Sequence, residues 1–414
     1  MKQELRLTNA NVKKVVIPAE GRITYHDTKI PGLQLRVSAA GTKSFCVRGD
    51  IEGKTIRVTI GRFPKMSADQ AERKAKEFIG EIGNRVNPNA RRKADIQKKT
   101  TLKQCLDHYL ESRSNLKESS VEQYERYLNK YLSDWLDKPL LKITRDKVER
   151  RHKEIGKKSN TSANATMRVL RALMEYAHGK YEDQNGDPII LHNPVKRLTH
   201  VKAWYKETRR STYIKSTEIK PWYEAVTTMP DWSGSPTPEL IRDYLLLVLF
   251  TGLRRNEASG LVWDQIDLKH NLLTVLDTKN GHPHVLPLSS YLVDLLKQRK
   301  KLTKKSKYVF PSGESSHLID PKKSVANVRE KSGVHFTIHD LRRTFITVAE
   351  SLGIRDYTLK RLLNHRSSGD VTDGYIMTDV ERLREPMQQI SDRLLLLSIQ
   401  KENVVALQIN AKSR

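Results

Sequence analysis

Residues 238–257 read PELIRDYLLLVLFTGLRRNE, an apolar stretch that ends in a glycine followed closely by two arginines. The run of leucines after a proline predicts an apolar helix over Pro238–Thr251, which Gly252 ends. Arg254 follows at this break, and Glu257, three residues further on, can orient the guanidinium if a helix resumes. Taken alone, an Arg–Glu pair at this spacing is more typical of an ordinary surface contact than of a site.

A predicted β-hairpin follows this helix. Two apolar segments, Leu272–Leu276 and Val285–Leu288, flank the turn Lys279-Asn280-Gly281, and Asn-Gly between such segments is a strong hairpin signal. The pattern places Lys279 at the tip, where a lysine is usually only solvated. Lys269 is the nearest alternative lysine.

Two histidine motifs lie further along the chain. In His339-Asp340-Leu341-Arg342-Arg343 the histidine and Arg342 are three residues apart, so a helix turns both towards one ligand. In Leu362-Leu363-Asn364-His365 the histidine is followed ten residues later by Tyr375. The only other tyrosine after His339 is Tyr357, which precedes His365 in a predicted helix. Each motif alone also fits a capping histidine or a half-buried tyrosine.

Together these stretches supply two arginines, a lysine, two histidines and a tyrosine. Guanidinium groups match phosphate oxygens with two parallel hydrogen bonds. Histidines donate to a phosphate and pass protons near neutral pH. A tyrosine hydroxyl beside them is a nucleophile that can form a covalent intermediate. The set predicts phosphoryl transfer without a metal, with the charge stabilised by cations of the protein.

The part of the chain from about Thr212 onwards resembles the catalytic domain of tyrosine recombinases, the phage-type integrases. The ordered signature of that family is Arg, Lys, His-x-x-Arg, His or Trp, and then Tyr. This order is met here by Arg254, Lys279, His339, Arg342, His365 and Tyr375. Many relatives have Leu-Gly-His where this chain has Leu363-Asn364-His365, and many space that histidine and the tyrosine nine residues apart instead of ten.

The resemblance implies a role for each of these residues. Tyr375 attacks the scissile phosphate and forms a 3′-phosphotyrosyl link, and Lys279 protonates the departing 5′-oxygen. Arg254 and Arg342 bind the non-bridging oxygens. His339 assists proton transfer at Tyr375, and His365 donates a hydrogen bond to the phosphate. Glu257 supports Arg254.

The first hundred residues predict a basic β-module. Apolar and polar residues alternate over three segments around Leu33–Val37, Phe45–Val47 and Ile56–Ile60, the pattern of strands with one apolar face. A helix is expected from Ser67, which forms a capping box with Gln70. Its apolar stripe would cover the sheet. The strand alternation turns three arginines to the opposite face, towards DNA: Arg36, Arg48 and Arg57.

These patterns predict a multidomain α+β protein. We expect an N-terminal three-stranded β-sheet plus helix, a helical domain, and a mainly α catalytic domain with a small β-sheet. By the resemblance, the first binds arm-type sites and the second is placed like a core-binding domain. The expected boundaries are 1–86 for the first domain, 87–100 for a linker, 101–183 for the helical domain, 184–211 for a second linker, 212–385 for the catalytic domain and 386–414 for a tail helix. The tail helix packs either on its own domain or on a neighbouring protomer.

Composition sets the broad class of partner. The chain of 414 residues has 75 Lys and Arg against 48 Asp and Glu, a net charge of +27, which favours a polyanion such as DNA or RNA. Two cysteines exclude a disulfide framework or a cysteine-rich zinc site. There is no GxxxxGK[ST] loop and no HExxH motif, so we expect no cofactor and no metal. The charged first residues are unlike a signal peptide, and no run is long enough for a membrane span. We expect a cytoplasmic protein.

The function that the resemblance implies is site-specific recombination of DNA. Such an integrase inserts and excises a prophage or genomic island, acting on attachment sites in double-stranded DNA as a homotetramer through a Holliday junction. The use of a host DNA-bending protein and of an excision or directionality factor is left open. Two alternatives remain: a catalytically silent DNA-binding regulator of the same fold, and strand passage like that of a type IB topoisomerase.

Overall fold

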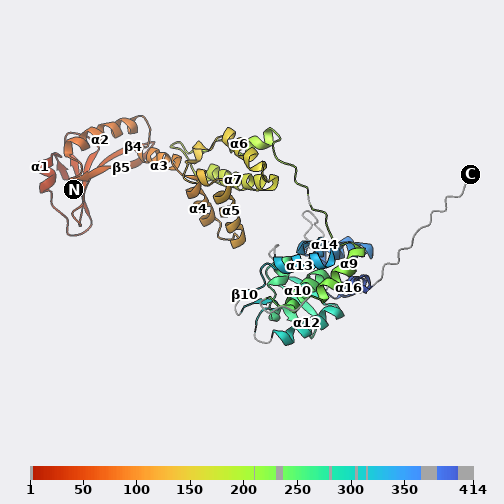
Figure 1. The fold of residues 1–414 in the computed structure, drawn as a ribbon. Helices are drawn as coiled ribbons and strands as arrows, with labels where there is room; N and C mark the ends of the chain where they lie inside the picture. The colour runs from red at the N-terminus through yellow and green to blue at the C-terminus, as the bar shows by residue number, and fades with distance from the viewer. Residues whose placement is uncertain are drawn as a thin grey trace, which may run out of the picture. The chain divides into compact units, whose positions relative to one another are not determined.

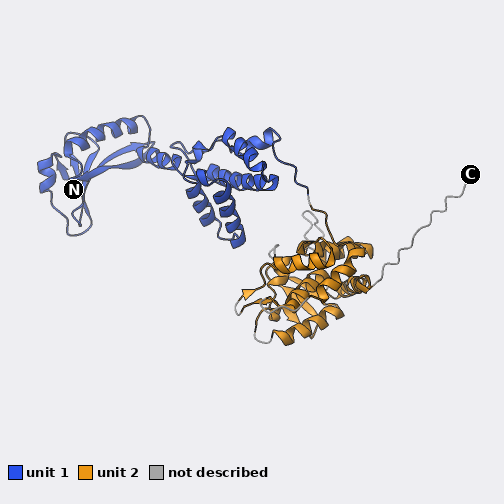
Figure 2. Ribbon diagram, viewed as in Figure 1, with its two compact units in different colours: residues 1–208 blue, residues 209–414 orange. Residues whose placement is uncertain are grey.

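The structure is a computed structural model that describes residues 3–208, 210–229, 236–278, 282–303, 306–313, 316–364 and 380–399. The chain forms two compact units, Met1–Thr208 and Arg209–Arg414 (Figure 2). Their apolar side chains gather into three separate cores, two in the first unit and one in the second.

The N-terminal module, at the N-terminal end of the ribbon in Figure 1, is built on a β-sheet. This sheet has five strands, not the three that were predicted. The three predicted strands are present as β3 (Leu33–Ser38), β4 (Lys43–Ile51) and β5 (Lys54–Phe63), each antiparallel to the next. Two further strands, β1 (Gln3–Leu5) and β2 (Arg22–Asp27), extend the sheet beside β3, and they pair parallel to each other. Neither strand has the alternation of apolar and polar residues that marks a half-buried strand. β1 has only three residues and buries none of them, and β2 buries only its last residue, Asp27.

One helix covers the apolar face of this sheet. Helix α2 (Ala68–Gly83) begins at the predicted capping box: Ser67 Oγ accepts from the Gln70 N–H at 3.2 Å, and Gln70 Oε1 accepts from the Ser67 N–H at 2.9 Å. The buried face of α2 is the predicted stripe, with Ile79 only partly buried: Ala71, Ala75, Phe78 and Ile82. The short helix α1 (Asn9–Lys14) packs beside α2.

The expected linker 87–100 contains a helix. Helix α3 (Pro88–Lys98) starts at Asn87, whose side chain accepts from two backbone N–H groups. An ion pair of 2.7 Å joins Arg91 to Glu81 of α2. The sequence showed no apolar period here because α3 buries only Pro88 and Ala94.

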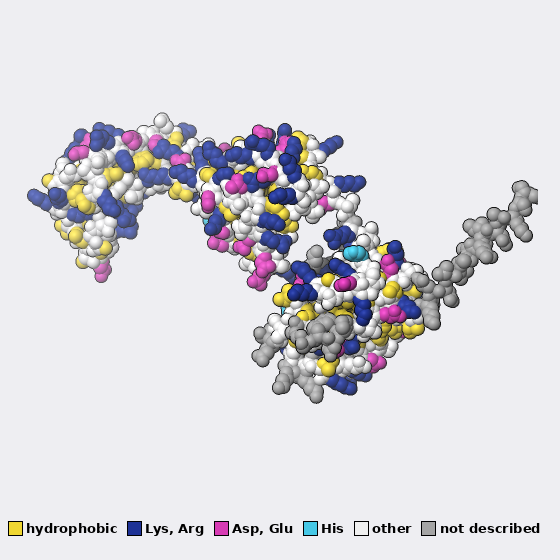
Figure 3. Space-filling view, in the orientation of Figure 1, with side chains coloured by type: hydrophobic (Ala, Val, Ile, Leu, Met, Phe, Trp, Pro, Cys, Tyr) yellow, Lys and Arg dark blue, Asp and Glu magenta, His cyan; other side chains and the backbone are white. Residues whose placement is uncertain are grey.

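The second half of the first unit is helical, as predicted. Its helices are α4 (Leu102–Ser112), α5 (Glu118–Tyr131), α6 (Arg145–Gly156), α7 (Asn160–Lys180) and α8 (Lys196–His200), with the short turns η1 (Ser133–Trp135) and η2 (Leu140–Lys142). Helix α7 packs against α4, α5 and α6. Lys and Arg side chains are spread over the visible face of the whole unit in Figure 3.

The second unit contains the apolar segment 238–257. Its helices are α9 (Ser216–Thr227), α10 (Pro238–Thr251), α11 (Arg255–Ser259), α12 (Ser290–Leu302), α13 (Lys322–Ser332), α14 (Ile338–Ser351), α15 (Asp356–Leu362) and α16 (Arg384–Ile399), with the turns η3 (Trp263–Gln265) and η5 (Val380–Leu383). Helix α10 has the predicted bounds, and every residue in it except Glu239 and Arg242 is buried. It packs against α9, α12, α14 and α16.

Small sheets flank these helices. The predicted hairpin is present as β7 (Leu272–Val275) and β8 (His284–Pro287), which pair antiparallel with Val275 opposite His284. Strand β6 (Ile266–Asp267) adds to β7, while β9 (Pro311–Ser312) and β10 (Ser316–His317) form a separate pair.

Helix α16 belongs to the core of its own unit. It begins at Arg384, two residues before the proline at which the tail helix was expected to start. Its buried residues pack against α9 and α14: Met387, Ile390, Leu394 and Leu397. Residues 400–414 of the expected tail lie outside the described part of the chain.

In the part of the chain that the structure describes, no helix has the length and apolar composition needed to cross a lipid bilayer.

Candidate active site

The chain turns sharply at Gly252, between α10 and α11. This residue has a φ of 66°, in the left-handed region, and a Cβ added there would lie 2.7 Å from a ring carbon of Phe345. The buried Tyr244 hydroxyl donates to the Arg255 carbonyl at 3.1 Å, which ties the start of α11 to α10. The turn therefore requires glycine, and it places Arg254 immediately before α11.

Arg254 is oriented by Glu257. The Arg254 backbone N–H donates to Oε2 at 3.1 Å, and its Nη1 donates to Oε1 at 2.8 Å. Burial pushes the pKa of Glu257 upwards, but the hydrogen bonds from Arg254 outweigh burial and hold that pKa below its ordinary value. The carboxylate therefore stays charged near neutral pH and fixes the direction of the guanidinium.

Arg342 of α14 lies almost entirely inside the protein, with 3% of its surface exposed. Its Nη1 donates to the Gly252 carbonyl, and its Nη2 donates to the Leu363 carbonyl at 2.8 Å. Burial and the nearby charge of Arg254 lower the pKa of Arg342 to about 10, although Glu257 opposes this. Because two cations repel each other here, an anion bound beside both would be stabilised.

His339 stands at the start of α14, where Asp340 holds the helix end. Asp340 is buried, and its Oδ2 accepts from both the N–H and the hydroxyl of Thr337 at 2.8 Å. Burial, followed by the charges of Arg343 and Arg342, lowers the pKa of His339. The imidazole is therefore neutral near pH 7 and can accept a proton.

His284 is a buried residue that belongs to none of the predicted motifs. It begins β8 with 5% of its surface exposed, and its Nε2 donates to the Arg361 carbonyl at 3.2 Å. Its Nδ1 has no hydrogen-bond partner among the described residues. This bond joins the hairpin to the end of α15, two residues before the carbonyl of Leu363 that receives Arg342. The available signal was a histidine within the otherwise apolar run 284–288.

Burial lowers the pKa of His284 from 6.5 to about 4. The unfolded chain therefore binds a proton near pH 6.5, whereas the folded unit does so only near pH 4, so folding stability is full above pH 6.5 and falls through this window. At pH 5 we expect a loss of about 2 kcal/mol from this group. Urea unfolding at pH 7 and pH 5 tests this expectation, since His284→Gln removes the titration. A difference between wild type and variant that does not change with pH would contradict it.

The structure brings four of the predicted residues into one centre: Arg254, Glu257, His339 and Arg342. Lys279, His365 and Tyr375 lie outside the described residues. No cluster of three or more His, Cys, Asp or Glu side chains that could hold a metal is found among the residues that the structure describes.

The three N-terminal arginines lie on one face of the first sheet. Arg48 and Arg57 are exposed and stand opposite each other on β4 and β5. Arg36 is half-buried on β3, opposite Ser44. All three alternate with the buried residues that face α2, so they lie on the side of the sheet away from that helix.

Known families account for both ends of the chain. The profile described as the phage integrase family matches residues 212–382, and the profile described as the arm DNA-binding domain matches residues 7–95. The first match lies within the expected catalytic domain 212–385, and the second covers most of the expected N-terminal module and extends into the expected linker 87–100.

Individual relatives agree with this assignment. The prophage integrase IntF of Escherichia coli is 22% identical over 94% of this chain and 90% of its own length. The tyrosine recombinase XerA of Thermococcus kodakarensis is 30% identical over 56% of this chain and 76% of its own length. In fold, the chain is similar to a lambda integrase tetramer bound to a Holliday junction, with a TM-score of 0.52 and 20% identity over 83% of this chain and 98% of that one. The chain therefore belongs to the phage integrase family of tyrosine recombinases.

Proposed function

We propose that this recombinase cuts and rejoins DNA at the centre formed by Arg254 and Arg342, with Tyr375 as its nucleophile. The observation that carries the proposal is the convergence of two guanidiniums, one fixed by Glu257 and the other buried against two backbone carbonyls. A phosphodiester has one negative charge shared by two non-bridging oxygens, which suits such a pair. His339, within electrostatic range of both arginines, supplies a neutral imidazole beside them.

The proposed step forms one bond and breaks another. The Tyr375 oxygen attacks the scissile phosphorus and loses its proton with the help of His339, and the bond from phosphorus to the 5′-oxygen breaks. Lys279 donates a proton to that 5′-oxygen, and His365 donates a hydrogen bond to the phosphate. The resulting 3′-phosphotyrosyl link keeps the energy of the diester, so a 5′-hydroxyl from another strand can reverse the step on a new partner.

The described residues weaken the alternatives to Tyr375 and Lys279. Tyr357 lies within α15, and its hydroxyl accepts from Nε and Nη2 of Arg361 at 3.0 and 2.7 Å. Lys269 lies in the turn between β6 and β7. Lys269 therefore precedes the start of β7, whereas Lys279 follows its end in the sequence. His284, which pairs with Val275 at that end of β7, lies within electrostatic range of Arg342 and Arg254, so this end is the one close to the arginines.

We place the protein on double-stranded DNA in the cytoplasm, where it inserts and excises a prophage or genomic island as a homotetramer. The lambda integrase tetramer bound to a Holliday junction, to which this chain is similar in fold, supports this assembly. In the proposed division of labour, residues 1–86 bind arm-type DNA through the face that carries Arg36, Arg48 and Arg57. Residues 101–183 bind the core site and residues 212–385 carry out the chemistry.

A covalent trapping assay tests the proposal. The full chain is incubated in EDTA with a nicked duplex that carries the junction of the element encoding it, and the products are separated on a denaturing gel. We expect an adduct with wild type that disappears in Tyr375→Phe, while both proteins bind the duplex equally. Tyr357→Phe is the matched control and should keep the adduct.

Other outcomes of this assay would point elsewhere. Equal binding by all three proteins with no adduct would favour a silent DNA-binding regulator. Relaxation of a supercoiled plasmid that lacks the junction would favour strand passage like that of a type IB topoisomerase. An adduct lost only in Tyr357→Phe would move the nucleophile to α15.

A further inference from the structure

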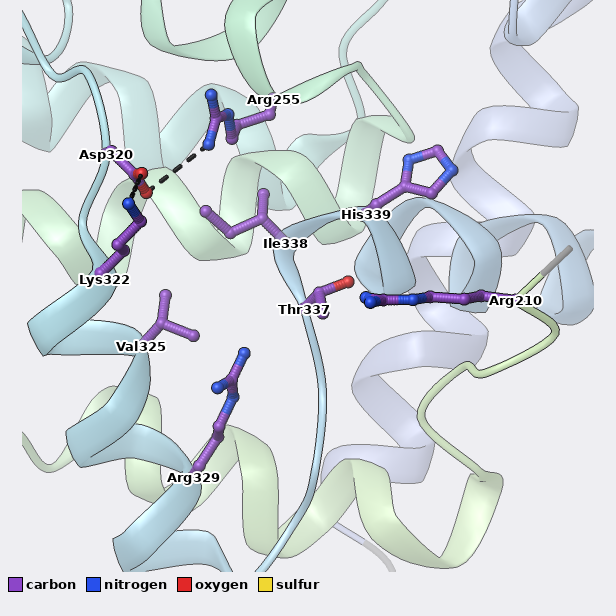
Figure 4. A pocket seen from close by; sticks show the side chains of 9 residues that line it. All are labelled: Arg210, Arg255, Asp320, Lys322, Val325, Arg329, Thr337, Ile338 and His339. Carbon is purple, nitrogen blue, oxygen red and sulfur yellow. Dashed lines mark ion pairs between the residues drawn. The ribbon is translucent and has the colours of Figure 1, made fainter. Parts of the chain in front are cut away.

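A basic pocket of about 620 Å³ opens beside the proposed active centre, within the second unit (Figure 4). Its volume is in the range of roughly 300–1,000 Å³ that is usual for ligand sites. Among the described residues, four cations and one carboxylate line it: Arg210, Arg255, Lys322, Arg329 and Asp320. His339 completes the wall towards the active centre, and its lowered pKa leaves the four permanent cations to set the charge near pH 7.

Arg329 is held in place for an external ligand. Its Nε donates to the Phe336 carbonyl at 2.7 Å, and its guanidinium carbon lies 5.8 Å from the centre of the buried Phe336 ring. These contacts fix the plane of the guanidinium and leave its two terminal nitrogens without a partner among the described residues. A fixed guanidinium loses little conformational freedom when it binds an anion.

Asp320 organises the opposite side of the pocket. Its carboxylate pairs with Arg255 at 3.5 Å and with Lys322 at 3.1 Å, and Figure 4 shows both side chains converging on it. One carboxylate cannot neutralise both cations, so the pocket keeps a positive charge. Between the charged sides lie the apolar side chains of Val325 and Ile338.

We infer that this pocket binds a second, non-scissile phosphodiester of the DNA backbone next to the one that is cut. The cations suit the phosphate, and the apolar side chains suit the adjoining deoxyribose. His339 borders both the pocket and the active centre, and Arg255 directly follows Arg254, so the two phosphates belong to one stretch of DNA. The inference rests on the proposed function, since it takes the Arg254–Arg342 centre as the place of the cut.

The test compares a variant that removes a positive charge from the pocket with one that removes its negative charge. Binding of the nicked junction duplex by the full chain is measured by fluorescence anisotropy over a range of salt concentrations, in a Tyr375→Phe background that keeps binding reversible. Arg329→Gln should weaken binding about tenfold and lower the slope of log K against log salt by about 0.9. Asp320→Asn should strengthen binding roughly threefold, because it removes the only carboxylate among the described lining residues.

Lys323→Gln is the matched control, because Lys323 is exposed on the same helix and does not line the pocket. It should leave binding within about twofold of wild type. Should Arg329→Gln fail to fold, Lys322→Gln carries the same test, since that side chain is 85% exposed.

Neutral methylphosphonates, placed singly at the phosphates that flank the nick, identify the ligand. A methylphosphonate at one non-scissile position should weaken binding by the protein with an unchanged pocket. The same methylphosphonate should not weaken binding by Arg329→Gln any further. Equal slopes for Arg329→Gln and Lys323→Gln, additive effects at every position, or weaker binding by Asp320→Asn would each overturn the inference. An adduct at Tyr375 combined with any of these results would reject the second phosphate site while the proposed function stands.

Discussion

Replacing Arg342 by alanine is expected to slow covalent cleavage of DNA by about a thousandfold, the usual effect of removing one donor that stabilises a transition state. The change also leaves two backbone carbonyls, those of Gly252 and Leu363, without the donors that they have in the folded unit. Such losses inside a protein cost about 1–3 kcal/mol each, so folding stability should fall as well.

Two measurements separate these effects. The rate of adduct formation is followed in a single turnover with saturating enzyme, and urea unfolding is measured on the same preparation. Arg342→Lys keeps the positive charge, but an ammonium group cannot donate to both carbonyls in the fixed geometry of a guanidinium. Compared with Arg342→Ala, it should therefore restore folding stability more than the cleavage rate. Arg343→Ala is the neighbouring control, because Arg343 lies further out and pairs with Asp340 at 2.9 Å. Cleavage by Arg342→Ala within tenfold of wild type would remove Arg342 from the catalytic set.

Substituting Gly252 by alanine is expected to destabilise the second unit by about 2–4 kcal/mol. The residue has a φ of 66°, which costs alanine about 1 kcal/mol. The new Cβ would also lie 2.7 Å from the fully buried ring of Phe345, so the ring or the backbone would have to shift. Urea unfolding followed by tryptophan fluorescence measures the loss.

The chain offers a control that isolates the steric part of this effect. Gly333 ends α13 with a φ of 69°, but a Cβ added there meets nothing within 4 Å. Gly333→Ala should therefore cost only about 1 kcal/mol. If the two variants lost equal stability, the contact with Phe345 would not be the reason that this turn requires glycine.

The elements with strong periodic signals were predictable from the sequence. Helix α10 has the predicted bounds because Pro238 and Gly252 mark its two ends. Strands β1 and β2 were missed because one has three residues and the other buries only Asp27. Helix α3 was missed because polar contacts hold it, and these need no apolar stripe. They are its cap, the ion pair of Arg91, and the hydrogen bonds from Asn89 and Arg92 to backbone carbonyls of β5.

The candidate site was predictable only in part. Spacing along one helix indicated that His339 and Arg342 share a side, and the spacing of three residues from Arg254 to Glu257 indicated that these two side chains pair. His284 was not predictable, because its partner is a backbone carbonyl 77 residues away in the sequence. The basic pocket was missed for the same reason, since its lining comes from distant segments. Lys279, His365 and Tyr375 remain predictions.

Because α10 is buried on almost every side, its backbone amides have no route to solvent short of unfolding the whole second unit. Hydrogen exchange in α10 should therefore report global opening of the unit, whereas the short helix α15, which buries only Leu359 and Leu362, can open in smaller fluctuations. The Gly252 carbonyl that receives Arg342 stands at the end of this slowly exchanging helix. Arg342 is thereby anchored on one side to a slowly exchanging helix, and local opening of α15 should affect only its second bond, to the Leu363 carbonyl.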